Sequence, residues 1–81
     1  MEITVKFHSL HAVVAGTRRD EMTASEPLTV KKLLELLLRK YPGLERLAES
    51  TIVSINRKLV HDDAMINDGD EVALLPLAGG G

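Results

Sequence analysis

The sequence predicts an α+β fold in which one long helix covers one face of a mixed β-sheet. Apolar and polar residues alternate over 1–8, which is the period of a half-buried strand, and 70–76 is predicted to be a final strand with Val72 and Leu74 on one face. Residues 30–41 instead place apolar side chains at helical spacing. The chain has 81 residues, of which 44% are hydrophobic, and this is enough for one modest core. We therefore expect a single domain over residues 1–81, with 77–81 as a flexible tail.

The N-terminal segment is predicted to be a strand followed by a short helical turn. The strand covers residues 1–8. The turn covers residues 9–15, with Ser9 as its N-cap and Gly16 as its C-terminal stop. The apolar side chains of the turn that we expect to face inward are Leu10, Val13 and Val14. A polar, edge-like strand is predicted over residues 17–25, and the turn would then connect the two strands as a hairpin.

The long helix is predicted over residues 30–41, between an N-cap at Thr29 and a stop at Pro42–Gly43. The apolar side chains that share one face of this helix are Val30, Leu33, Leu34, Leu37 and Tyr41. Such a stripe could bind a partner or a membrane surface. We assign it to the core instead, because a domain this small needs these leucines to cover its sheet.

Short elements are predicted after the helix. They are a helical turn at 44–48 and strands at 51–56, 58–60 and 70–76. Asn56–Arg57 is placed to turn the chain between two of these strands, and Asn67–Asp68–Gly69 is a strong turn signal before the last one. The full order of strand, strand, long helix, strand, short strand and strand is that of a ubiquitin-like β-grasp fold.

The composition excludes several classes of function. There is no cysteine, which rules out disulfides, thiolate metal sites and cysteine nucleophiles. No phosphate-binding loop, dinucleotide fingerprint or G-x-S-x-G motif is present, so we expect no catalytic residues and no bound cofactor. A net charge of −2 and 2% aromatic residues argue against nucleic-acid binding. No apolar run approaches a membrane span, and we expect a cytoplasmic protein.

The three histidines do not predict a metal site. A structural metal centre needs three or four converging ligands. His8 and His11 flank the end of a predicted strand and need not converge, so we expect both to be solvent-exposed polar residues. His61 stands alone before two aspartates. Residues 68–70 resemble part of a calcium loop, but no glutamate closes it at the required spacing.

The C-terminal glycines are the strongest functional candidates from the residues alone. Glycine has no Cβ, so a tail containing Gly79, Gly80 and Gly81 is thin. Five extended residues reach ~17 Å, enough to thread a narrow channel in a partner enzyme. The tail would present the α-carboxylate of Gly81, which becomes an electrophile once activated as an acyl-adenylate. The competing interpretation is a frayed tail or an expression scar.

An apolar surface is predicted beside this tail. If Leu74 points to the core, strand alternation turns Leu75 outward. Leu75 and Leu77 would then form an exposed patch of the kind that marks interaction sites. The expected partner interface is Leu75, Pro76 and Leu77.

A string of motifs in the C-terminal third carries a family resemblance. In order they are Val53-Ser-Ile-Asn56, Val60, Asp68-Gly-Asp-Glu-Val72, Leu75-Pro76 and Gly80-Gly81. With these motifs at this spacing, the chain resembles the MoaD/ThiS family of sulfur carrier proteins along essentially its whole length. The branch that it resembles most closely is the small subunit of molybdopterin synthase.

The resemblance implies a non-catalytic subunit. An E1-like enzyme would use ATP to adenylate Gly81, and sulfur transfer would then give a thiocarboxylate. A large synthase subunit would receive the tail and supply the catalytic side chains, and the sulfur would enter the dithiolene of the molybdenum cofactor. No metal, nucleic acid or membrane is implied.

The chain also departs from the family pattern. Leu10-His11-Ala12 stands where Leu-Arg-Glu is frequent, and Leu74-Leu75-Pro76-Leu77 lacks the usual aromatics. Gly79 stands where Ala or Thr is usual. The alternatives therefore stay open: a sulfur carrier for thiamin, a tungsten cofactor or tRNA thiolation, a ubiquitin-like protein modifier, or a plain interaction domain.

Overall fold

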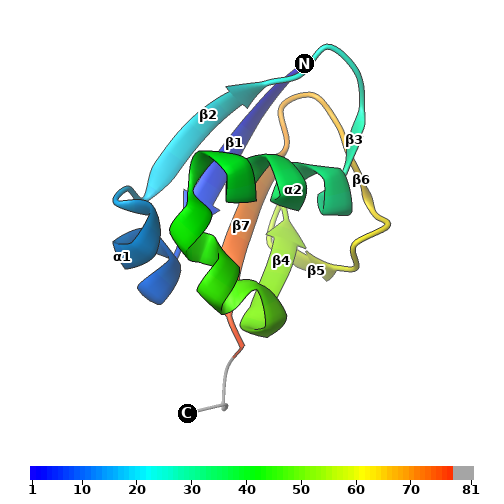
Figure 1. The fold of residues 1–81 in the computed structure, drawn as a ribbon. Helices are drawn as coiled ribbons and strands as arrows, with labels where there is room; N and C mark the ends of the chain where they lie inside the picture. The colour runs from blue at the N-terminus through cyan, green and yellow to red at the C-terminus, as the bar shows by residue number, and fades with distance from the viewer. Residues whose placement is uncertain (78–81) are drawn as a thin grey trace.

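The elements of the computed structural model, which describes residues 1–77, follow the predicted order (Figure 1). They are β1 (Glu2–Phe7), α1 (Leu10–Ala15), β2 (Arg19–Thr23), β3 (Leu28–Thr29), α2 (Val30–Lys40), η1 (Pro42–Ser50), β4 (Thr51–Ile55), β5 (Lys58–Val60), β6 (Met65–Ile66) and β7 (Glu71–Pro76). The predicted α+β fold of β-grasp type is confirmed, with α2 as its long helix, while the single domain over residues 1–81 stays a prediction.

Five strands form a mixed sheet in the order β2-β1-β7-β4-β5. The central pair, β1 and β7, is parallel, and the other pairs are antiparallel. The first two strands form the predicted hairpin, and α1 is its connection. In the register, Val5 lies opposite Val72 and Phe7 opposite Leu74, so the apolar faces of the two central strands coincide.

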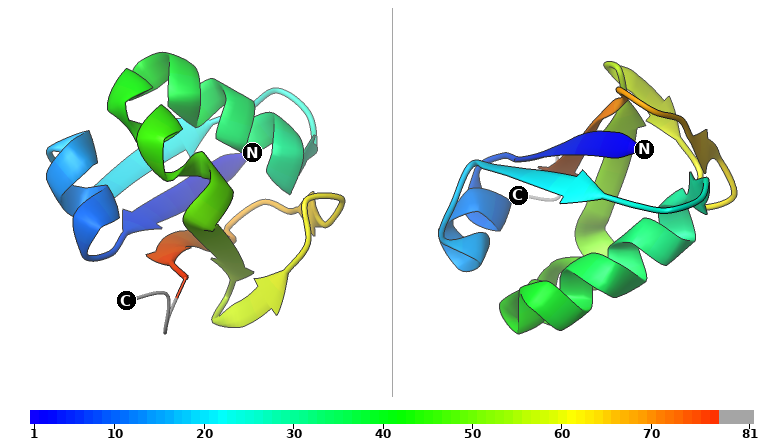
Figure 2. Two further views of the ribbon diagram at one scale, coloured as in Figure 1. Left: turned by 60° about the horizontal axis from the view of Figure 1, so that its bottom comes forward. Right: turned by 90° about the horizontal axis from the view of Figure 1, so that it is seen from above.

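The long helix covers one face of this sheet (Figure 2). Val30, Leu33 and Leu37 are fully buried against the apolar side chains of β1 and β7, so the leucine stripe belongs to the core. The helix begins where Thr29 Oγ1 accepts the N–H of Lys32 at 3.1 Å, which confirms the predicted N-cap. Among residues 1–77, no helix has the length and apolar character needed to cross a membrane.

A 3₁₀ helix follows α2 and is longer than predicted. Tyr41 forms the C-cap of α2, and η1 then starts at Pro42, inside the segment expected only to stop the helix. Gly43 lets this helix approach α1 closely, since a Cβ at that position would lie 2.8 Å from Val14 Cγ1. The short α1 is therefore packed against η1 as well as against the sheet.

The prediction for the inward face of α1 was wrong in part. Leu10 and Val13 are 52% and 75% exposed, whereas Val14 packs against the core as expected. The position facing the interior is taken by His11, which is 1% exposed. Ser9 makes no capping bond from its side chain, although Gly16 does end the helix in the left-handed conformation (φ 78°). A helix of six residues is too short for its apolar spacing to define one inward face.

Two short strands were not predicted. β3 and β6 pair with each other as a separate sheet, with Leu28 opposite Ile66. Strands of two residues are too short to show an alternating pattern. The predicted turns are present: Asn56 and Arg57 have φ values of 50° and 72°, and Gly69 has a φ of 83°.

Candidate functional site: the base of the C-terminal tail

The predicted tail leaves the sheet at the end of its central strand. We call residues 75–77 the tail root. Its backbone is anchored by the register of Pro76 opposite Thr51 and by the N–H of Leu77, which donates to the Ser50 carbonyl at 2.9 Å. Figure 1 shows β7 beside β4, running toward the C-terminus of the chain. The predicted tail residues Gly79, Gly80 and Gly81 lie outside the described residues.

An apolar surface lies beside the tail root, on the sheet face opposite α2. Leu74 is 2% exposed on the core side, so Leu75 points to this open face, where it is half-buried beside its register partner Ile52. After the strand, Leu77 is 55% exposed. Leu77 is therefore exposed as predicted, whereas Leu75 faces the predicted side but is half-buried. Partner binding by Leu75, Pro76 and Leu77 stays a prediction.

One member of this surface was missed from the sequence. Leu59 in β5 is 69% exposed and lies opposite Ser54, in the same face as Leu75. Leu59 and Leu75 both line a shallow hollow of about 310 Å³. The tight turn at Asn56–Arg57 fixes the hairpin register, and this could have placed Leu59 on the open face. A strand of three residues is too short to reveal its exposed face by periodicity.

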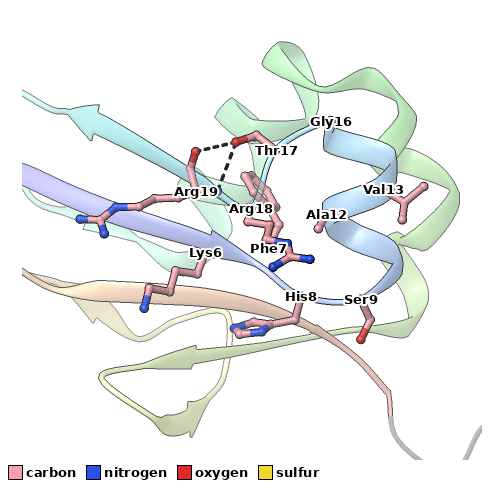
Figure 3. A pocket seen from close by; sticks show the side chains of 10 residues that line it. All are labelled: Lys6, Phe7, His8, Ser9, Ala12, Val13, Gly16, Thr17, Arg18 and Arg19. Carbon is pink, nitrogen blue, oxygen red and sulfur yellow. Dashed lines mark hydrogen bonds between the residues drawn. The ribbon is translucent and has the colours of Figure 1, made fainter.

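Cationic side chains flank the apolar surface. A neighbouring pocket between the β1–β2 hairpin and α1 has a volume of about 720 Å³, and its cationic lining residues are Lys6, Arg18 and Arg19 (Figure 3). Thr17 shapes its rim, because the hydroxyl bonds both the N–H and the carbonyl of Arg19. Lys6 Nζ lies 3.3 Å from Glu71 Oε2 on the same face. A partner that presents carboxylates around an apolar centre would complement this distribution.

A buried histidine lies on the other side of the tail root. His11 was expected to be solvent-exposed, but α1 directs it inward, where Nε2 lies 2.8 Å from Thr51 Oγ1. Its Nδ1 is buried and has no hydrogen-bond partner among the described residues. Burial lowers the pKa of His11, and the charge of His8 lowers it further.

The described residues do not form a metal centre. Within residues 1–77, no group of three or more histidine, cysteine, aspartate or glutamate side chains is placed to hold a metal ion. His8 is exposed and His11 is buried, so the two side chains do not share one environment.

With this geometry established, comparison with known proteins identifies the family. The ThiS family model matches residues 8–81. The chain belongs to the ThiS family. The predicted recognition is therefore confirmed.

Curated relatives of this ThiS-family chain share one name. A "molybdopterin synthase sulfur carrier subunit" of Mycobacterium tuberculosis is 31% identical over 75 residues, which cover 93% of this chain and 90% of the relative. The protein of that name from Chlamydomonas reinhardtii is 26% identical over 83 residues and covers both chains completely. Sequence similarity thus extends along the whole domain, as the C-terminal motifs predicted.

Solved structures of this family have the same fold. SAMP1 from Haloferax volcanii superposes with a TM-score of 0.86 at 27% identity over the full length of both chains. A structure named small archaeal modifier protein 1 of the same organism gives 0.82 at 25% identity, covering 93% of this chain and 95% of that one. A chain from the complex of subunits 1 and 2 of molybdopterin-converting factor of Helicobacter pylori gives 0.71 at 23% identity with full coverage of both chains, which shows the fold alone.

Proposed function

We propose that this chain is a sulfur carrier that donates sulfur as the small subunit of molybdopterin synthase. The observation that carries the proposal is the family match, which includes the terminal glycines, combined with a sheet whose central strand β7 ends at Pro76, shortly before them in the sequence. The relatives named as molybdopterin synthase sulfur carrier subunits support this choice among the pathways of the family.

The chemistry would take place on the α-carboxylate of Gly81. A carboxylate oxygen attacks the α-phosphorus of ATP, a P–O bond forms, and pyrophosphate leaves. Hydrosulfide then attacks the acyl carbon of the adenylate, a C–S bond forms and the C–O bond to AMP breaks, so that sulfur replaces one oxygen and AMP leaves. The carrier contributes no side chain to either step. Its task is to present the carboxylate, for which the thin glycine tail is suited.

Two successive partners are required by this scheme. An E1-like enzyme would activate the tail, and a large synthase subunit would receive the loaded tail and use its sulfur. The apolar surface of Leu59, Leu75 and Leu77, with its cationic border, is the surface that we assign to these partners. Exposed apolar patches beside a functional group commonly mark such interfaces. The expected cytoplasmic location also stays a proposal, to be tested by fractionation of cells that express a tagged chain.

Intact-mass measurement tests the proposed function. The full chain is incubated with an E1-like enzyme, ATP and a sulfur source. We expect a mass gain that corresponds to replacement of one oxygen by sulfur. A matched chain that lacks Gly81 is the control and should show no gain. A folded full-length chain that gains no mass with several such enzymes would contradict the proposal.

A second candidate is a ubiquitin-like protein modifier. The observation that favours it is the similarity to the structures named SAMP1 and small archaeal modifier protein 1. A modifier would form an isopeptide bond between Gly81 and a lysine of a target. Expression of an N-terminally tagged chain and blotting of the extract separates the two functions. A ladder of conjugates that is lost on deletion of Gly80–Gly81 would support the modifier, and a single band would argue against it.

A further inference from the structure

A short chain of hydrogen bonds fixes the chemical form of His11. The Thr51 hydroxyl has one hydrogen, which it donates to the Leu47 carbonyl at 2.6 Å. Thr51 Oγ1 must therefore accept from His11 Nε2, 2.8 Å away, so Nε2 carries the ring proton. Nδ1 is then an unprotonated nitrogen, buried without a partner among the described residues. The ring is neutral in this arrangement.

Protonation of His11 is incompatible with this arrangement. A second ring proton would sit on Nδ1, where it would be a buried donor without an acceptor and would bring a charge into the core. The ring is 1% exposed, so water cannot solvate that charge without a local opening. An opening that exposes the ring must separate His11 from the segment that it contacts, which is the junction of η1 and β4.

This junction is also the anchor of the tail root. Thr51, which accepts from His11, lies opposite Pro76 in the register. The preceding residue, Ser50, accepts the N–H of Leu77 at 2.9 Å. The segment Ser50–Thr51 thus stands between the buried imidazole and the point where the tail leaves the sheet.

We propose that His11, acting through Thr51, positions the root of the C-terminal tail, and that protonation of the ring releases that root. His11 is a positioning residue, since it touches neither the terminal carboxylate nor a reacting atom. The consequence for catalysis rests on the proposed function, in which the tail must enter a partner in one geometry. A root already held in place loses less conformational freedom on binding.

The charges around His11 do not compensate a second proton. The ionisable side chains on the elements packed against α1 are Glu2 and Lys6 of β1, Glu45, Arg46 and Glu49 of η1, and Glu71 of β7. None of them forms a hydrogen bond or ion pair with the His11 ring in the described part of the chain. The group whose charge acts on the ring is His8, and it too disfavours protonation.

Amide hydrogen exchange of the full-length chain tests the inference. The protection factor of the Leu77 amide is measured from pH 7.5 to pH 5, together with the imidazole resonances of His11. We expect Leu77 protection to fall by up to about tenfold per pH unit as the pH drops below 6.5, while core amides of β1 and α2 stay protected. In His11→Gln, whose side-chain amide can still donate to Thr51 but cannot titrate, Leu77 should stay protected throughout.

A second pair of variants keeps the test decisive if His11→Gln does not fold. Thr51→Val removes the bridging hydroxyl and should leave Leu77 unprotected at every pH, whereas Thr51→Ser should behave like the parent chain. Leu77 protection that does not change with pH, or that falls only together with the core amides, would overturn the inference.

Adenylation gives the functional readout. We measure kcat/KM for the parent chain and for His11→Gln with the same E1-like enzyme at each pH. The ratio of the parent value to the variant value should fall as the pH falls, with the same midpoint pH as the loss of Leu77 protection. The ratio cancels the pH dependence of the enzyme itself. If no variant is adenylated at any pH, the proposed function fails while the exchange result still decides the role of His11.

Discussion

Asp20 joins β2 to the end of α2 through two donors that share one carboxylate oxygen. Tyr41 Oη donates to Asp20 Oδ2 at 2.6 Å, and Lys40 Nζ lies 2.8 Å from the same atom. Burial alone would raise the pKa of Asp20, but the hydrogen bonds from Lys40 and Tyr41 outweigh it and leave the pKa below its usual value. The ring of Tyr41 also packs edge-on against Phe7, with centroids 5.3 Å apart. These side-chain contacts thus join β1, β2 and the C-terminal end of α2.

Tyr41→Phe should cost about 1 kcal/mol of unfolding free energy at neutral pH. The substitution removes the hydroxyl donor but keeps the ring contact, and Lys40 still pairs with Asp20. The difference from the parent chain should shrink as the pH falls below 3.8, because a protonated Asp20 gains less from either donor. Urea unfolding at neutral pH and at about pH 3 checks both statements. An equal difference at the two pH values would contradict a contribution from the charge-assisted bond to the Asp20 carboxylate.

His11 should give the stability of the chain a second pH dependence. Its pKa in the fold lies below the ordinary value of 6.5, so the unfolded chain binds the proton more readily. The contribution to stability is therefore complete above 6.5 and is lost as the pH falls below it, with a slope of up to ~1.4 kcal/mol per pH unit.

Unfolding free energies at pH 7.5, 6.5 and 5.5 measure this slope. His11→Gln should be flatter over the same range, although it can be less stable at pH 7.5. The carboxylate of Asp20 does not contribute here, because its loss begins only below 3.8. Parallel curves for the two chains would contradict the assignment of a neutral, buried ring.

At the scale of elements, the length of a segment decided what the sequence could predict. The helix α2 has 11 residues, which is enough for an apolar face to repeat and for Thr29 to mark its start. The six residues of α1 complete fewer than two turns, and Leu10 and Val13 were assigned to the wrong side. Of the candidate site, strand alternation predicted Leu75, but the burial of His11 depends on how α1 meets η1, which no local pattern records.

The close approach of η1 to α1 gives a testable prediction at this scale. Gly43→Ala would place a Cβ only 2.8 Å from Val14 Cγ1, which is too close for two carbon atoms. We expect a loss of about 1–3 kcal/mol, because one of the two elements must shift.

The double variant Gly43→Ala with Val14→Ala identifies the cause. Removal of the Val14 methyl groups should recover part of the loss, so the two single effects should not add. Strict additivity in urea unfolding would mean that Gly43 is required for its backbone conformation and not for the contact.

At the scale of the whole molecule, the two faces of the sheet have different roles. One face is covered by α2 (Figure 2) and holds the core. The other exposes Leu59 and the half-buried Leu75 beside cationic side chains. If the open face is the partner interface that we propose, stability and partner recognition depend on separate sets of side chains. A substitution on the open face can change binding without a change in the fold.

Leu59→Glu and Leu75→Glu should each weaken binding to an E1-like enzyme by at least about tenfold, because a carboxylate would be buried in an apolar contact. Met65→Glu is the matched control, since Met65 is 51% exposed but lies in the small β3–β6 sheet. Calorimetric titration measures binding, and circular dichroism checks the fold. A loss of binding that only follows a loss of folded protein, or an equal loss in Met65→Glu, would contradict a specific interface.

The position of β7 has a consequence during protein synthesis. It is the last strand in the described chain, yet it lies in the middle of the sheet between β1 and β4. A nascent chain that has not yet released residue 76 from the ribosome lacks the strand to which both halves of the sheet pair. Incomplete products cannot close the domain, so a prematurely terminated chain would not display its end from a folded carrier. The topology thus couples closure of the sheet to translation as far as residue 76, and under the proposed function only such a chain would present its tail to an activating enzyme.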